Sequence, residues 1–174
     1  MNKRAFIAGG GALAVTAAVI AGIMATGKSE GGGFLGPGPL LADVNLVLEV
    51  LLVLGLTWGM RLARSGNIEA HRVNQTVWVL VNSALVAFIM ASAMASFKIP
   101  SLRALADPGN AVTVVHGTLG TLTFLAGAWL VLQMNDILPQ RFHVRRWRLL
   151  MRATLAGYWA VALLGIVTYR YWYA

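Results

Sequence analysis

The 174-residue chain is hydrophobic, basic and free of cysteine. Hydrophobic residues make up 58% of it and charged residues only 11%, whereas a soluble domain carries about 25% charged residues. This composition excludes an ordinary soluble domain and indicates an integral membrane protein. The lack of cysteine excludes disulfides, iron–sulfur clusters, thiolate metal sites and covalently attached haem, so histidine, methionine and carboxylates are the remaining candidate ligands.

Five apolar stretches are long enough to cross a membrane, because an α-helix rises about 1.5 Å per residue and the hydrocarbon core is about 30 Å thick. They cover approximately residues 5–26, 41–60, 73–97, 111–134 and 149–172. Clusters of glycine, proline, asparagine and aspartate separate them, as expected of turns. We therefore predict an all-α integral membrane bundle of about five transmembrane helices.

The chain divides into three predicted parts. Residues 1–26 have a basic start and an apolar stretch, which is typical of a secretory signal or of a retained first helix, and we predict an uncleaved N-terminal transmembrane helix. Residues 27–40 are rich in glycine and proline and are expected to form a flexible outer linker. Residues 41–174 are predicted to form a four-helix transmembrane bundle.

Lysine and arginine are distributed unevenly between the two ends of these spans. Basic residues of short loops stay on the cytoplasmic side. With the N-terminus inside, ten basic residues are cytoplasmic and four face out, namely Lys28, Lys98, Arg103 and Arg170. We therefore predict a multi-pass protein of the bacterial inner membrane with a cytoplasmic N-terminus and an external C-terminus, and no nucleic-acid partner.

The densest basic segment precedes and enters the fifth span. It contains five arginines, namely Arg141, Arg145, Arg146, Arg148 and Arg152. Such a cluster attracts the anionic lipids of a bilayer surface, by about 1 kcal/mol per basic residue, and it is equally suited to docking a partner protein. The sequence leaves both interpretations open.

A few polar side chains lie within the apolar spans, where they are costly and indicate function. Glu49 and His116 fall at a similar depth of two different spans, which predicts a hydrogen bond or ion pair between them. Asn45, one turn from Glu49, would extend this buried polar cluster, to which we also assign Asn82. The cluster suits interhelical hydrogen bonding, a site for a proton or substrate, or ligation of a cofactor.

Cofactor ligation is suggested by the residues around His116. Gly120 follows it by four positions, so a tetrapyrrole such as haem b or a chlorin would have room against that helix face, although glycine there also permits close helix packing. Met90 and Met94 offer thioethers for a less favoured copper site with His116. His71 and His143 lie among arginines at the cytoplasmic rim, where a solvated or headgroup-facing role is the simpler interpretation.

Several motifs occur in the order of a known family. They are Glu69-Ala70-His71-Arg72, Val115-His116-Gly117, Arg148-Leu149-Leu150-Met151-Arg152-Ala153-Thr154, Tyr158-Trp159 and Gly165-Ile166-Val167-Thr168-Tyr169. Over about residues 40–170 the chain thus resembles the bacterial membrane-protein family typified by YozB, to which the cytochrome oxidase maturation factor CtaM belongs. The resemblance implies four histidines, two near each membrane face, for haem or copper handling.

The chain departs from this family pattern at two of the four histidines. His71 and His116 match, whereas the other two expected positions are occupied by Ala93 and Trp147. His143, Met90 or Met94 would be the available substitutes. The loss of one histidine from each implied pair favours a structural or accessory protein over a metal-transferring enzyme.

The function expected from this resemblance is a non-catalytic accessory subunit or assembly factor bound to a larger respiratory membrane complex of the haem–copper oxidase type. The alternative is a tetrapyrrole-binding subunit of an electron-transfer or photosynthetic complex, with His116 as the axial ligand, Gly120 beneath the ring and His71 as a further ligand candidate. No nucleophile–base set, phosphate-binding loop or site for a soluble small-molecule substrate is recognisable.

Overall fold

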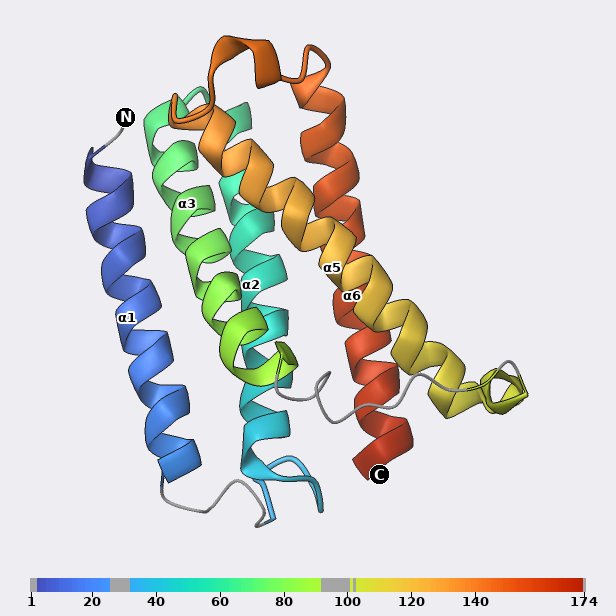
Figure 1. Ribbon diagram of the computed structural model, residues 1–174. Coiled ribbons are helices and arrows are strands. Elements are labelled where there is room, and N and C mark those ends of the chain that lie inside the picture. The colour runs from blue at the N-terminus through green and yellow to red at the C-terminus, as the bar shows by residue number, and fades with distance from the viewer. Residues whose placement is uncertain (1–2, 26–31, 92–100, 102, 174) are drawn as a thin grey trace.

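A computed structural model describes residues 3–25, 32–91, 101 and 103–173 of the chain (Figure 1). The long helices are α1 (Lys3–Ala25), α2 (Leu40–Arg64), α3 (Ile68–Leu85), α5 (Pro108–Met134) and α6 (Trp147–Tyr173). The π-helical turn η1 (Val86–Met90) continues α3, and the short 3-10 helices η2 (Ala104–Ala106) and η3 (Gln140–Phe142) lie in connections. Five helical segments are long and apolar enough to span a membrane, which confirms the predicted all-α bundle.

The helix ends follow local capping chemistry. Asn67 precedes α3 and its side chain accepts a hydrogen bond from the amide of Ala70 over 3.1 Å. Asp107 caps α5 in the same way through the amide of Asn110, with Pro108 in the first turn. The helix α3 therefore begins at Ile68, five residues before the span predicted at residue 73, because the polar cap and not the hydropathy determines where the helix begins.

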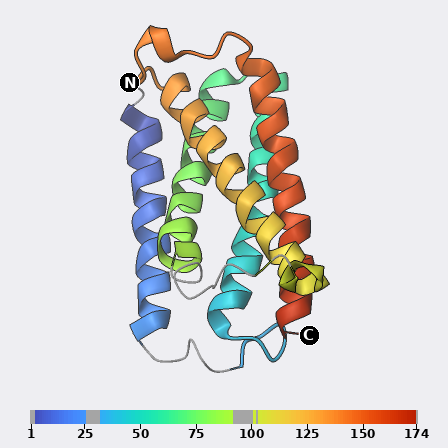
Figure 2. The ribbon, with the colours of Figure 1, turned by 45° about the vertical axis from the view of Figure 1, so that its right-hand side comes forward.

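Four helices close into a ring. Helix α3 contacts both α2 and α5, and α6 contacts the same two helices from the other side. Helix α1 lies outside this ring against α3, as Figures 1 and 2 show. The approach of α1 depends on a glycine, since a Cβ atom on Gly9 would lie 2.6 Å from the Cδ1 atom of Leu80.

The interior between the helices is apolar but small. One buried cluster joins α2 to α6 through Leu52, Val53, Leu56, Tyr158 and Ala162, and a second joins α1 to the end of α3 through Ile20, Leu85 and Ile89. Many large apolar side chains instead point outward, among them Ile7, Val15, Leu122 and Leu163, each more than half exposed. Such outward faces are compatible with contact to a lipid bilayer.

The segment before α2 is folded as a turn where the structure describes it. The amide of Gly33 donates to the carbonyl of Gly38 over 2.6 Å, and a Cβ atom on Gly38 would lie 2.9 Å from Cγ of Tyr173 in α6. Residues 32–39 are thus held against the end of α6, which corrects the expectation of a freely flexible tether for this part of the linker. Residues 27–31 lie outside the described residues.

The two ends of the bundle differ in charge. The start of α1, the end of α2, the start of α3 and the connection from α5 to α6 share one end, which we call the arginine-rich end, and the C-terminus lies at the opposite end (Figure 1). Arg61, Arg64, Arg72, Arg141, Arg145 and Arg146 belong to these segments, and Arg148 and Arg152 lie at the start of α6 beside them. Their common location is compatible with the predicted orientation, and the cytoplasmic location of this end stays a prediction.

Candidate functional site

Glu49 and His116 meet inside the ring of helices, as their predicted depths indicated. Oε1 of Glu49 in α2 lies 3.8 Å from Nε2 of His116 in α5. The amide of Asn45 donates to the same Oε1 over 3.1 Å, so Asn45 extends the pair along α2. Glu49 is only 6% exposed, which removes it from both water and lipid.

A glycine that the sequence argument had not selected for this role makes the approach possible. Gly165 in α6 faces the pair, and a Cβ atom there would lie 2.5 Å from Oε2 of Glu49 and 3.3 Å from Cε1 of His116. Gly120 faces elsewhere, since its Cβ atom would make an ordinary 3.7 Å contact with Val161 of α6. Gly120 therefore permits helix packing and does not open a recess beneath a tetrapyrrole ring.

The orientation of the His116 ring does not favour its use as an axial ligand. Its Nδ1 lies 3.1 Å from the carbonyl oxygen of Val161. Because a carbonyl can only accept, Nδ1 carries the hydrogen and Nε2 has the free lone pair. That lone pair faces Glu49, so neither ring nitrogen is directed at an open space.

Asn82 forms a separate site. Its amide donates to the phenol oxygen of Tyr158 over 3.2 Å and so joins α3 to α6. Tyr158 precedes Gly165 by about two turns of α6, which is about 10 Å along the helix. The predicted cluster of Asn45, Glu49 and Asn82 is thus divided into two sites.

The copper site predicted at His116, Met90 and Met94 stays a prediction, because Met94 lies outside the described residues. Among the described residues, no three His, Asp or Glu side chains are grouped so that they could hold a metal ion. Met90 ends the π-helical turn η1, while Met94 and Ala93 lie outside the described residues.

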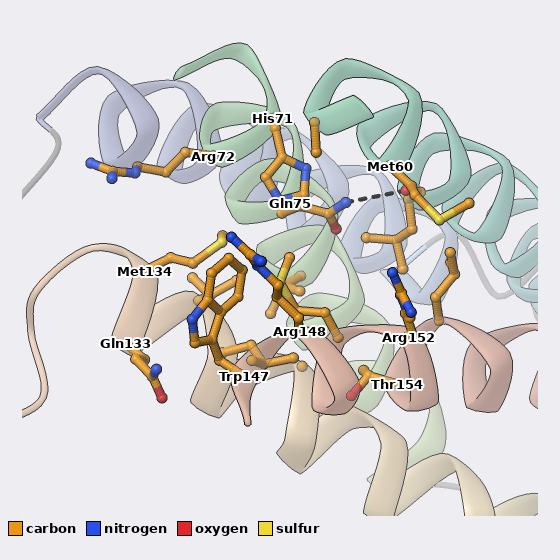
Figure 3. A pocket seen from close by; sticks show the side chains of 18 of the residues that line it. Met60, His71, Arg72, Gln75, Gln133, Met134, Trp147, Arg148, Arg152 and Thr154 are labelled. Carbon is orange, nitrogen blue, oxygen red and sulfur yellow. Dashed lines mark hydrogen bonds between the residues drawn. The ribbon is translucent and has the colours of Figure 1, made fainter. Parts of the chain in front are cut away.

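A cavity of about 690 Å³ opens at the arginine-rich end, between α2, α3, α5 and α6 (Figure 3). Its deeper wall is apolar and includes Leu56, Val79, Leu130, Val131, Leu155 and Tyr158. Four arginines contribute to its lining, namely Arg64, Arg72, Arg148 and Arg152, together with the single acidic residue Asp136. The cavity is therefore amphipathic, with a positively charged rim above an apolar interior.

His71 lines this cavity and is 5% exposed. Its Nδ1 lies 2.8 Å from the carbonyl oxygen of Gly59 and must donate to it. Nε2 then has a free lone pair, and it forms no hydrogen bond within the described part of the chain. The interpretation of His71 as a solvated rim residue is therefore corrected, because α2 and α3 bury it at the wall of the cavity.

The position at which the family resemblance implied a second histidine also faces this cavity. Trp147 lines it at the start of α6, and the guanidinium of Arg148 lies 5.2 Å from the centre of the Trp147 ring. Figure 3 shows Trp147 and Arg148 reaching toward the side occupied by His71 and Gln75. His143 lines the cavity as well, with its Nε2 held 3.0 Å from the carbonyl oxygen of Leu138.

The five arginines of the cluster that the sequence indicated lie in different surroundings. Arg148 and Arg152 line the cavity, whereas Arg141 lies over the ring of Phe142, 4.8 Å from its centre. Arg145 and Arg146 border a shallower hollow beside Trp147. All five arginines are exposed, so both interpretations, a bilayer surface and a partner protein, stay open.

Sequence reasoning missed the cavity and two buried polar contacts. Asp43, fully buried, accepts hydrogen bonds from the amide of Leu35 and the phenol of Tyr169. Asn135, also fully buried, donates to Thr76 over 3.0 Å. Asp43 was recognisable as a polar residue in a span, but nothing along the chain identified its partner.

The fold and site define a helical bundle with five helices long and apolar enough to span a membrane and with a ligand-sized cavity at its arginine-rich end. No protein-family model, curated protein or solved structure matches the chain. The resemblance to the YozB family stays a prediction, and the site is argued from the geometry of this chain.

Proposed function

We propose that this chain is a non-catalytic accessory subunit or assembly factor of a respiratory complex of the haem–copper oxidase type, and that it holds a tetrapyrrole in the arginine-rimmed cavity. The single observation that carries the ligand is His71, whose Nδ1 is fixed by the Gly59 carbonyl while Nε2 has a free lone pair at the cavity wall. The respiratory complex as a partner is supported only by the order of the sequence motifs that resemble the YozB family.

The donor set of the cavity suits a haem. Metal-ligating histidines commonly donate their second nitrogen to a carbonyl or carboxylate, which fixes the ring and raises the basicity of the ligand. The apolar wall would receive the macrocycle, and the arginines would pair with its carboxylates. The volume of about 690 Å³ falls within the range of about 300–1,000 Å³ that is usual for small-molecule and cofactor sites.

The geometry favours His71 over His116 as the axial ligand. His116 has one nitrogen at the Val161 carbonyl and the other directed at Glu49. Trp147, at the place of the second implied histidine, has no nitrogen lone pair for a metal. We therefore expect His71 to be the axial ligand, and His143, whose Nε2 is held by the Leu138 carbonyl, to be the remaining candidate for the sixth position.

The accessory role and the location belong to the same proposal. We propose a bacterial inner membrane as the location, with the arginine-rich end in the cytoplasm, because the basic residues of the connecting loops gather there. The cavity would then receive its ligand from the cytoplasmic side or the adjoining leaflet. A protein that holds a cofactor without catalysing a reaction is compatible with the role of an assembly factor and with that of a permanent subunit.

The test is the visible spectrum of the full chain, purified in mild detergent from haem-replete cells and recorded before denaturation. We expect a Soret band that is lost in His71→Ala and kept in His116→Ala and His143→Ala. Circular dichroism and gel filtration of each variant check that it is folded. A colourless wild-type chain that also fails to take up added haem would overturn the proposal of a tetrapyrrole ligand. A band lost only in His116→Ala would assign the site to His116 instead of His71.

The partner is tested in the same preparation. Proteins retained with the chain in mild detergent are identified by mass spectrometry, with cells lacking the tagged chain as the control. Retention of oxidase subunits is the expected result. A chain that purifies alone from cells rich in the oxidase, even after cross-linking, would contradict the accessory role without affecting the ligand.

A further inference from the structure

The Glu49–His116 pair lies at a different site from the cavity. In this pair, two hydrogen-bond acceptors face each other. The Val161 carbonyl requires the hydrogen on Nδ1 of His116, so Nε2 of the neutral ring has a lone pair. Oε1 of Glu49 lies 3.8 Å from that nitrogen. Two acceptors in this arrangement repel each other unless a proton or another positive species lies between them.

The surroundings of Glu49 do not supply enough donors for an ionised carboxylate. The Asn45 amide donates to Oε1, but Oε2 has no hydrogen-bond partner in the described structure. Two further buried oxygens, Oδ1 of Asn45 and Oγ1 of Thr168, are also without a partner there. Burying a charge that lacks a partner is strongly unfavourable, because the charge loses its hydration without compensation.

Among the residues that the structure describes, no fixed positive charge lies near enough to balance Glu49. At this end of the bundle, the charged groups that the structure describes are Asp43 on α2, Arg103 and Asp107 before α5, and Arg170 on α6. Asp43 is engaged by Leu35 and Tyr169, and the other three are exposed. Within the described chain, His116 is the only basic group that lies within ion-pair distance of Glu49.

We propose that Glu49 and His116 form a binding site for one proton, which the two side chains share inside the membrane. The proton resides either on the carboxyl, which then donates to Nε2, or on Nε2 as an imidazolium that donates to the carboxylate. Both forms have no net charge, and they differ only in the position of this proton. Uptake and release exchange the proton with water and involve no electron transfer.

Depth and packing support a role for this site in handling protons. Glu49 lies nine residues into α2, about 13 Å along the helix from Leu40, so it is within the apolar span. Gly165 leaves room for Oε2 of Glu49 itself, because a Cβ atom there would lie 2.5 Å from this oxygen. With a proton between them, the two atoms can close from 3.8 Å to the usual hydrogen-bond distance of about 2.7–3.2 Å.

The experiment measures infrared difference spectra of the full chain in detergent between acid and alkaline pH. We expect a protonated carboxyl band that shifts in heavy water, is lost in Glu49→Gln and is kept in the matched variant Glu69→Gln, because Glu69 is exposed at the other end. In His116→Gln the band is expected at a shifted frequency and a shifted pH midpoint, because its acceptor has changed.

Two measurements keep the result decisive. Labelling the glutamates of the wild-type chain with carbon-13 shows without any variant whether the band comes from one of the three glutamates, and Glu69→Gln then separates Glu49 from the exposed Glu69. A glutamate signal that stays carboxylate, together with a His116 ring that stays neutral, at every pH at which the chain is folded would overturn the proposal. A carboxylate band that instead moves when sodium replaces potassium would assign the site to a metal cation and also overturn it.

Discussion

The phenol of Tyr169 donates a hydrogen bond to Oδ1 of Asp43 over 2.5 Å, which joins the end of α6 to the start of α2. Oδ2 of the same carboxylate accepts from the amide of Leu35 over 2.6 Å. The carboxylate of Asp43 also lies against Gly33, where a side chain would collide with it. One buried aspartate therefore fastens the segment before α2 to the last helix of the bundle.

Removal of the Tyr169 hydroxyl is expected to weaken this connection. Tyr169→Phe leaves a fully buried carboxylate with one donor fewer, which lowers the free energy of unfolding by about 1–3 kcal/mol. The matched control is Tyr171→Phe, because Tyr171 is 55% exposed. Thermal or denaturant unfolding in one detergent measures both variants, and equal losses would contradict the role of the Asp43 bond.

Close packing of α2 on α3 depends on Gly55. A Cβ atom on Gly55 would collide with the indole of Trp78, a large ring that has to move as a whole. We expect Gly55→Ala to lower the free energy of unfolding by about 1–3 kcal/mol, as overpacking usually does. In the control Gly10→Ala nothing lies within 4 Å of the new methyl group, so stability should be unchanged or slightly higher. A loss of stability in Gly10→Ala but not in Gly55→Ala would contradict this packing.

The arginines of the cavity are expected to set the affinity for an acidic ligand. Hydrogen bonds to charged groups contribute about 1.5–3 kcal/mol, so Arg148→Gln should weaken haem binding by about tenfold to a hundredfold. Arg145→Gln is the control, because Arg145 does not line this cavity. Titration of purified chain with haem, followed at the Soret band, measures both. Equal affinities would show that carboxylates do not reach Arg148.

The absence of cysteine makes the orientation directly measurable. Single cysteines at Arg146, in the connection between α5 and α6, and at Asp107, before α5, lie at opposite ends of the bundle. In intact cells we expect a membrane-impermeant maleimide to label Asp107→Cys and to leave Arg146→Cys unlabelled until the membrane is permeabilised. The reverse labelling would invert the topology and place the cavity outside.

Much of the fold was predictable from local properties. Each helix is apolar over a length that suits a bilayer, and Asn67 and Asp107 supplied caps at the places where turns were expected. The contact between Glu49 and His116 was also predictable, because depth in a membrane is proportional to residue number along a helix. These features depend on one segment at a time, or on depth alone.

The cavity and its ligand candidate were not predictable in this way. Helix α5 is apolar on every side, so its sequence pattern does not show which face packs inward. Gly120 and His116 both contact Val161, so α6 packs against the face of α5 on which a ring recess was predicted, while Gly165 of α6 faces the pair. His71 was taken as a rim residue because its partner, the Gly59 carbonyl, is on another helix.

The sequence by itself determined five helices long and apolar enough to span a membrane, the gathering of arginines at one end and the position of each polar side chain along its helix, because hydrophobic length and charge act along the chain. Only the tertiary structure decided that α2, α3, α5 and α6 enclose a cavity with His71 at its wall, and that Tyr169 reaches Asp43. The physical reason is that helices in lipid gain little from hydrophobic burial against each other, so their rotation and tilt follow from close packing and hydrogen bonds between residues distant in sequence.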